Sequence, residues 1–152
     1  MDKLSYTDFI KIYEDMETIN LIGKIDTEFL NENRIECLYY IFPLIERIVL
    51  EIYKLVPEAD VEHFEQGTMR TIKSMIDNNK DLDVLPKYIN ELVIKYYGDN
   101  GIRNELFHVK NSTIKVEIDF NELNYLIMKL VLLLKNRINE YDKFEIKEIA
   151  YL

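Results

Sequence analysis

Arg103, Asn104 and His108 are the residues of this chain whose types and spacing could catalyse a reaction. They lie in the stretch Gly98–Lys110, which opens with two glycines and an Asp-Asn pair, residues typical of a turn. His108 is one of only two histidines, and an imidazole can take up or release a proton near neutral pH. The guanidinium of an arginine matches phosphate oxygens, and an asparagine can orient either group. Together the three residues predict a site that handles a phosphate group.

The residues after the turn have helical periodicity, with an apolar stripe formed by Ile102, Leu106 and Val109. Asn104 and His108 are four residues apart and therefore share a face roughly opposite that stripe. Arg103 and Asn104 fall in the expected first turn, where free N–H groups and the helix dipole favour an anion. If the stretch has no catalytic role, the arginine and the histidine are simply polar residues on the solvent side of a helix.

This residue set fits attack of an RNA 2′-hydroxyl group on its own phosphodiester, a reaction that requires no metal or other cofactor. His108 would activate the nucleophile or protonate the leaving oxygen, and Arg103 would stabilise charge on phosphorus. Lys110 is the candidate for a further contact with the substrate. In-line displacement needs a base and an acid on opposite sides of phosphorus, whereas each chain offers one motif histidine. A two-fold dimer that brings two copies of His108 together would meet this need.

The sequence R-N-E-L-F-H, residues 103–108, resembles the R-N-x-x-x-H signature of the HEPN superfamily, the all-helical "higher eukaryotes and prokaryotes nucleotide-binding" domains. Many HEPN domains are metal-independent ribonucleases of toxin–antitoxin, phage-defence and CRISPR systems. The resemblance implies an RNA substrate, a composite site across a homodimer, and an antitoxin or defence-system protein as a partner. As the family implies, the motif opens a late helix just before a long final helix.

The chain departs from one family pattern, R-x4-6-H-x-Y, whose tyrosine is modified when some HEPN toxins are neutralised. Lys110 stands where that tyrosine would be, so this form of control is in doubt. Several HEPN-like domains are also non-catalytic dimeric modules that bind a nucleotide or a partner protein. That alternative stays open beside the ribonuclease.

Phe107 is the candidate interface residue. On a helical wheel it lies about 40° from Arg103 and well away from the apolar stripe. A phenyl ring in that position indicates a contact outside its own bundle, and a second copy of the same face is the simplest partner.

The composition predicts one globular domain spanning residues 1–152, with 48% hydrophobic residues and few glycines and prolines. A net charge of −9 argues against a protein that coats nucleic acid. Residues 95–115 hold four cationic and two anionic side chains, a local net charge of +2 that suits contact with one or two phosphates. The N-terminus lacks signal-peptide features, no apolar run could span a membrane, and the single Cys37 fits a reducing compartment. We therefore expect a cytoplasmic protein with no membrane contact.

The apolar periodicity predicts an all-α, up-and-down helical bundle. A first helix is expected to end at Gly23–Lys24, and a second to begin at Asp26 or Thr27 and continue to Pro57. Pro43 inside the second pattern predicts a kink or two abutting helices. Two shorter helices follow, one ending at Asn78–Asn79 and one starting near Pro86 and ending at Gly98.

Asp119 and Glu122 are spaced as a capping box for a long final helix that carries Leu123, Ile127, Leu130, Leu134, Ile138 and Tyr141. Before it, Thr113–Asp119 alternates between apolar and polar residues, which predicts either a short strand or an extended connector. The tail Lys143–Leu152 alternates loosely and could pair with Thr113–Asp119 as a hairpin.

Overall fold

The computed structural model describes residues 16–61, 72–97 and 118–150. They form α2 (Met16–Leu30), α3 (Arg34–Lys54), α5 (Ile72–Asn78), the short 3-10 helix η1 (Lys80–Leu82), α6 (Lys87–Tyr97) and α8 (Phe120–Ala150). These parts of the chain contain helices and no strand, so the predicted all-α bundle with a long final helix is confirmed.

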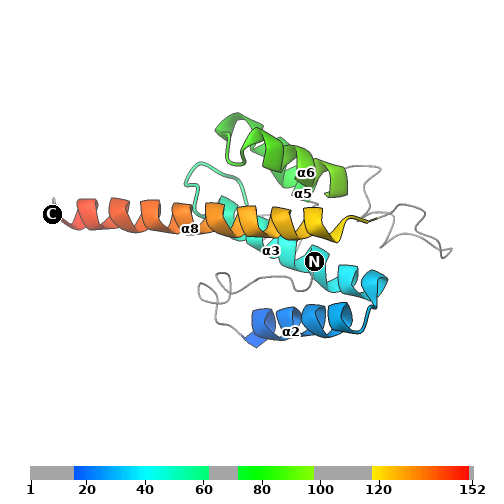
Figure 1. The fold of residues 1–152 in the computed structure, drawn as a ribbon. Coiled ribbons are helices and arrows are strands. Elements are labelled where there is room, and N and C mark those ends of the chain that lie inside the picture. Colours follow the sequence, from blue (N-terminus) through cyan, green and yellow to red (C-terminus); the bar gives the residue numbers. More distant parts are fainter. Residues whose placement is uncertain (1–15, 62–71, 98–117, 151–152) are drawn as a thin grey trace.

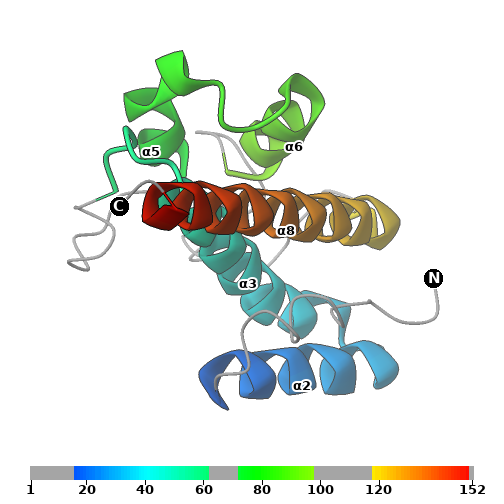
Figure 2. The same cartoon turned by 90° about the vertical axis from the view of Figure 1, so that its left-hand side faces the viewer.

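Helix α3 is the centre of the bundle. It contacts α2, α5 and α8, and α8 also contacts α6 (Figure 1). In both views α2 lies on one side of the α3–α8 pair and α5 with α6 on the other (Figure 2). Ten residues of α3 are buried, and they share one hydrophobic core with side chains of all the other α-helices described. Burial of apolar surface from five helices is the main stabilising contribution of this arrangement.

The expected helix break at Gly23–Lys24 is wrong, because α2 continues through both residues to Leu30. A glycine inside a helix costs only about 1 kcal/mol, and burial of Ile25 and Phe29 offsets that cost. The hydroxyl of Thr27 donates a hydrogen bond to the Gly23 carbonyl oxygen at 2.9 Å, as expected inside a helix rather than at its start.

The chain instead turns at residues 31–33, between α2 and α3. Glu32 has φ 61°, in the left-handed region, and Asn33 donates from its backbone N–H to the Glu28 carbonyl oxygen at 2.9 Å. The turn therefore begins eight residues after Gly23, the glycine that was expected to mark it.

Pro43 lies inside α3, which is one helix from Arg34 to Lys54 rather than two abutting helices. A proline in a helix interior removes one hydrogen bond and costs about 3 kcal/mol. Its neighbours Phe42 and Leu44 are both fully buried, so packing against the core outweighs this local cost.

The two shorter helices end where the sequence predicts, at Asn78 for α5 and at Tyr97 for α6. Helix α6 begins just after Pro86, whose carbonyl oxygen accepts a hydrogen bond from the Asn90 N–H at 2.9 Å.

The predicted hairpin at the C-terminus is wrong, because α8 stays helical to Ala150. Extending a formed helix adds one hydrogen bond per residue, so a short alternating pattern does not stop it. Residues 113–117 of the proposed strand lie outside the described residues, and Ile118 and Asp119 precede α8 without strand pairing. The 31 residues of α8 span about 46 Å, and its C-terminal end extends past the other helices in Figure 1.

Candidate functional site

The five candidate site residues belong to the motif segment, here residues 98–117, which lies outside the described residues. They are Arg103, Asn104, Phe107, His108 and Lys110, and His63 also lies outside the described residues. The structure does describe the two helix ends that flank the segment, the last turn of α6 and the first turn of α8.

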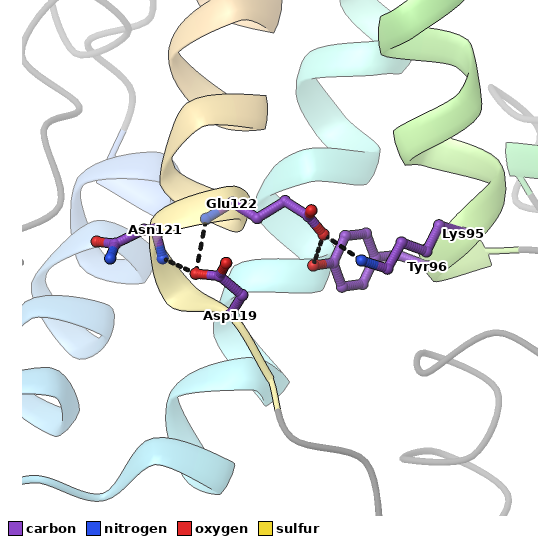
Figure 3. A network of polar contacts seen from close by, with 5 residues as sticks. All are labelled: Lys95, Tyr96, Asp119, Asn121 and Glu122. Atoms are coloured by element: carbon purple, nitrogen blue, oxygen red, sulfur yellow. Dashed lines mark hydrogen bonds and ion pairs between the residues drawn. The ribbon is translucent and has the colours of Figure 1, made fainter.

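A network of three side chains fastens these two helix ends together (Figure 3). The Glu122 carboxylate of α8 lies 2.6 Å from the Lys95 ammonium of α6, measured from Oε1 to Nζ. The same oxygen accepts a hydrogen bond from the Tyr96 hydroxyl, also at 2.6 Å. The two helix ends on either side of the twenty-residue motif segment therefore lie next to each other.

The N-terminus of α8 is capped by Asp119, as the sequence predicts. Its Oδ1 accepts hydrogen bonds from the N–H groups of Asn121 at 2.9 Å and Glu122 at 3.2 Å. The second half of the predicted capping box is wrong. The Glu122 side chain does not return to the cap residue but contacts α6, because an ammonium and a phenol there bind the carboxylate.

The protonation states of this network follow from its contacts. Hydrogen bonds from Lys95, and then from Tyr96, lower the pKa of Glu122 below its ordinary value. Burial raises the pKa of Tyr96, and the hydrogen bond to Glu122 raises it further. At neutral pH the carboxylate is thus an acceptor and the phenol a donor. This pair is a structural anchor and does not exchange protons near pH 7.

A second contact holds the end of α6 against the middle of α3. The Tyr97 hydroxyl donates a hydrogen bond to the Phe42 carbonyl oxygen at 2.8 Å. The two rings meet edge to face with their centres 5.6 Å apart. Tyr97 is buried, so this contact holds the last residue of α6 against α3.

Arg34, at the start of α3, places a positive charge beside the start of α8. Its guanidinium carbon lies 3.8 Å from the centre of the Phe29 ring and 5.6 Å from that of Phe120. The two rings are themselves 6.0 Å apart and roughly perpendicular. Arg34 was not predicted as a site residue, because its neighbour Phe120 is 86 residues away in the chain and no local pattern connects them.

Cys37, the only cysteine, is fully buried in α3, and its thiol donates to the Ile25 carbonyl oxygen at 3.6 Å. Burial raises its pKa from 9.0 to about 11, so it is a poor nucleophile at neutral pH. Over the described residues, no three His, Cys, Asp or Glu side chains are grouped so that they could hold a metal ion. None of the helices in those same ranges has the length and apolar character needed to cross a membrane.

Comparisons of the chain with protein-family models, with curated proteins and with solved structures found no match.

Proposed function

We propose that this chain is a metal-independent endoribonuclease of the HEPN type that acts as a toxin or an antiviral defence effector. The observation that carries the proposal is the sequence R-N-E-L-F-H at residues 103–108, with one arginine, one asparagine and one histidine at the family's spacing. Two structural features are compatible with it: the described helices form an all-α bundle, and the motif segment directly precedes the long final helix α8.

The contacts described at the two helix ends that flank the motif segment support the proposal. Catalytic side chains must be held within a fraction of an ångström of their working geometry, which is easier when the segment that carries them is fixed at both ends. The Lys95–Glu122 ion pair and the Tyr96–Glu122 hydrogen bond join these ends. The Arg34 guanidinium carbon, 5.6 Å from the centre of the Phe120 ring, adds positive charge at the first turn of α8.

The reaction would begin with attack of a ribose 2′-oxygen on the adjacent phosphorus. One His108 imidazole accepts the 2′-hydroxyl proton while the bond from phosphorus to the 5′-oxygen breaks. The imidazolium of a second copy gives its proton to that leaving oxygen. The Arg103 guanidinium stabilises the negative charge of the transition state. The products are a 2′,3′-cyclic phosphate and a 5′-hydroxyl.

Replacement of His108 tests the mechanism. Purified protein should cut single-stranded RNA in excess EDTA, and His108→Ala should lower the rate about 10²–10⁴-fold, the usual contribution of general acid–base catalysis. His63→Ala, which changes the only other histidine, is the matched control and should retain wild-type activity. Products with 3′-hydroxyl ends, or equal loss in both variants, would contradict the mechanism.

The composite site requires a homodimer in which the two motif segments face each other, with Phe107 at the contact. Phe107→Glu should shift the protein to monomer in analytical ultracentrifugation and abolish cleavage, because the second histidine is then absent. The variant keeps Arg103, Asn104 and His108, so loss of activity would report assembly alone. A monomer that cuts RNA at the wild-type rate would rule out the composite site.

A non-catalytic HEPN-like dimer that binds a nucleotide or a partner protein is the second candidate. Two observations favour it: the net charge of −9, and Lys110 in place of the family's tyrosine. A stable wild-type dimer with no cleavage of any RNA tested would select this function.

A further inference from the structure

The side chain of Arg34 is held in place where α2, α3 and α8 meet. Its guanidinium carbon lies 3.8 Å from the centre of the Phe29 ring, a stacking distance, and 5.6 Å from the centre of the Phe120 ring. Its Nη1 also donates a hydrogen bond to the Phe29 carbonyl oxygen at 3.4 Å. Arg34 is nevertheless an exposed residue, so these contacts fix the group and still leave part of it open to solvent.

None of these contacts neutralises the charge of Arg34. Aromatic rings bind the flat face of a guanidinium, so its in-plane N–H donors remain available to an anion. Within residues 16–61, 72–97 and 118–150, no ion pair joins Arg34 to a carboxylate. The carboxylate of Glu28 instead accepts a hydrogen bond from the Asn33 side-chain amide at 2.7 Å.

Lys95 offers a contrast at the same turn of α8. Its ammonium lies 2.6 Å from the Glu122 carboxylate, which balances its charge. Phe120 and Glu122 are two residues apart and so lie about 160° from each other around the helix. This spacing agrees with Figure 2, where α2 and α6 lie on opposite sides of the α3–α8 pair. On the α2 side of this turn, Arg34 therefore carries a positive charge that is not balanced by an ion pair among the described residues.

We propose that Arg34 binds a backbone phosphate of single-stranded RNA. The choice of RNA rests on the proposed ribonuclease function. The planar edge of a guanidinium matches two phosphate oxygens and can donate two parallel hydrogen bonds to them. Arg103 is assigned to the phosphate that is cut, so Arg34 would hold a different phosphate of the same strand. In a chain whose net charge is −9, affinity for RNA must come from individually placed cations of this kind.

A purely structural role explains less about Arg34. Exposed cation–π contacts contribute little to stability. Arg34 is also the first residue of α3, where the helix dipole disfavours a positive charge. A structural role predicts that replacement changes stability, with no effect on the salt dependence of RNA binding.

The test measures binding of an RNA that cannot be cut. A fluorescein-labelled 2′-O-methyl oligouridine of about 12 nucleotides lacks the attacking hydroxyl, so its fluorescence anisotropy reports binding to the full-length protein. Arg34→Gln should weaken this binding about tenfold, because a charge-assisted hydrogen bond is lost. It should also lower the slope of log affinity against log salt concentration by about 0.7, the value for one phosphate of a single strand.

Two further variants make the result specific to the guanidinium. Arg34→Lys keeps the charge without the planar donors, so it should retain the wild-type salt slope and lose only part of the affinity. Arg137→Gln is the matched control, because that arginine lies about 25 Å further along α8 than Phe120. It should alter neither the affinity nor the slope.

Cleavage kinetics separate this proposal from the ribonuclease itself. On an RNA that can be cut, Arg34→Gln should raise KM and leave kcat nearly unchanged, because the contact is the same before and during the reaction. If the protein binds the oligouridine through Arg34 but cuts no RNA, the ribonuclease is wrong and the Arg34 contact stands. If it cuts RNA and Arg34→Gln has wild-type affinity and salt slope, the Arg34 contact is wrong and the ribonuclease stands.

Three other results would overturn the proposal. The wild-type protein does not bind the oligouridine. A polyglutamate peptide displaces the oligouridine from the wild-type protein but not from Arg34→Gln, which would assign the guanidinium to an acidic partner protein. Arg34→Gln has a much lower melting temperature and Arg34→Lys restores neither stability nor binding, which would make the residue structural.

Discussion

Asn79, the residue after α5, ties the residues that follow α3 to the end of α5 through three hydrogen bonds from one side chain. Its Oδ1 accepts from the Asp60 N–H at 2.7 Å, and its Nδ2 donates to the carbonyl oxygens of Asp60 at 3.1 Å and Met75 at 2.8 Å. Only 5% of Asn79 is exposed, so water cannot easily replace these partners.

Replacement of this amide should therefore destabilise the protein. Asn79→Ala is expected to lower the free energy of unfolding by about 1–3 kcal/mol, because buried backbone groups lose their partners. Asn78→Ala is the matched control: the neighbouring asparagine is exposed and should change stability by less than about 0.5 kcal/mol. Urea unfolding followed by circular dichroism measures both, and equal effects would show that the three hydrogen bonds contribute little.

At the scale of single residues, the sequence predicts local contacts well and distant ones poorly. Asp119 caps α8 as expected, because both partners of the cap lie within three residues. The pairing of Glu122 with Lys95 spans 27 residues and depends on how α6 packs against α8. Likewise, Asn79 was expected to end a helix, but nothing near it in the sequence indicates its bond to Asp60.

At the scale of elements, the periodicity of apolar residues located the helices, and Pro86 and Gly98 marked the ends of α6 correctly, whereas the breaks predicted inside apolar helical patterns were wrong. Gly23 and Pro43 both lie inside continuous helices, and the tail after Lys143 is helical rather than extended. In each case the structure favours the longer helix. A glycine or proline inside a helix costs only about 1–3 kcal/mol, and burial of two or three apolar side chains stabilises the helix by more than that.

The two faces of α8 allow a direct comparison of the same substitution. Leu130 is fully buried and Leu132 is 50% exposed, only two residues away on the same helix. Leu130→Ala should cost about 2–5 kcal/mol through loss of buried methyl groups and the cavity left behind. Leu132→Ala should change stability by about 0.5 kcal/mol or less. Denaturant midpoints measure both, and a large loss of stability in Leu132→Ala would mean that another part of the protein's own chain covers Leu132.

At the scale of the whole molecule, the sequence predicts the fold class and the candidate site by different routes. Apolar periodicity of all the helices predicts the bundle. The candidate site depends on three side chains, Arg103, Asn104 and His108, in a segment whose anchoring contacts are not local. The sequence therefore predicts which residues could act, and the structure adds that Lys95, Tyr96 and Glu122 hold the flanking helix ends together.

At alkaline pH, the stability of the whole molecule depends on buried groups that stay protonated in the folded state. Burial raises the pKa of Cys37 from 9.0 to about 11 and that of Tyr53 from 10.0 to about 12. Between each unfolded and folded value, the native state binds a proton that the unfolded chain has lost. Stability is therefore complete below about pH 9 for Cys37 and pH 10 for Tyr53, and it falls as pH rises through the folded values.

We accordingly expect the free energy of unfolding, measured by urea denaturation, to fall between pH 9 and pH 12, by up to about 1.4 kcal/mol per pH unit for each group between its unfolded and folded pKa. Tyr53→Phe should flatten this fall above pH 10, because the phenol that would ionise on unfolding is absent. Glu122 affects stability at acid pH. Because its pKa is lowered in the fold, it contributes stability above about pH 4.5, its unfolded pKa, and that contribution is lost as pH falls. Glu122→Gln should therefore reduce the change in midpoint between pH 5 and pH 3. A midpoint constant from pH 7 to pH 12, or a wild-type slope in Tyr53→Phe, would show that these buried groups do not govern alkaline unfolding.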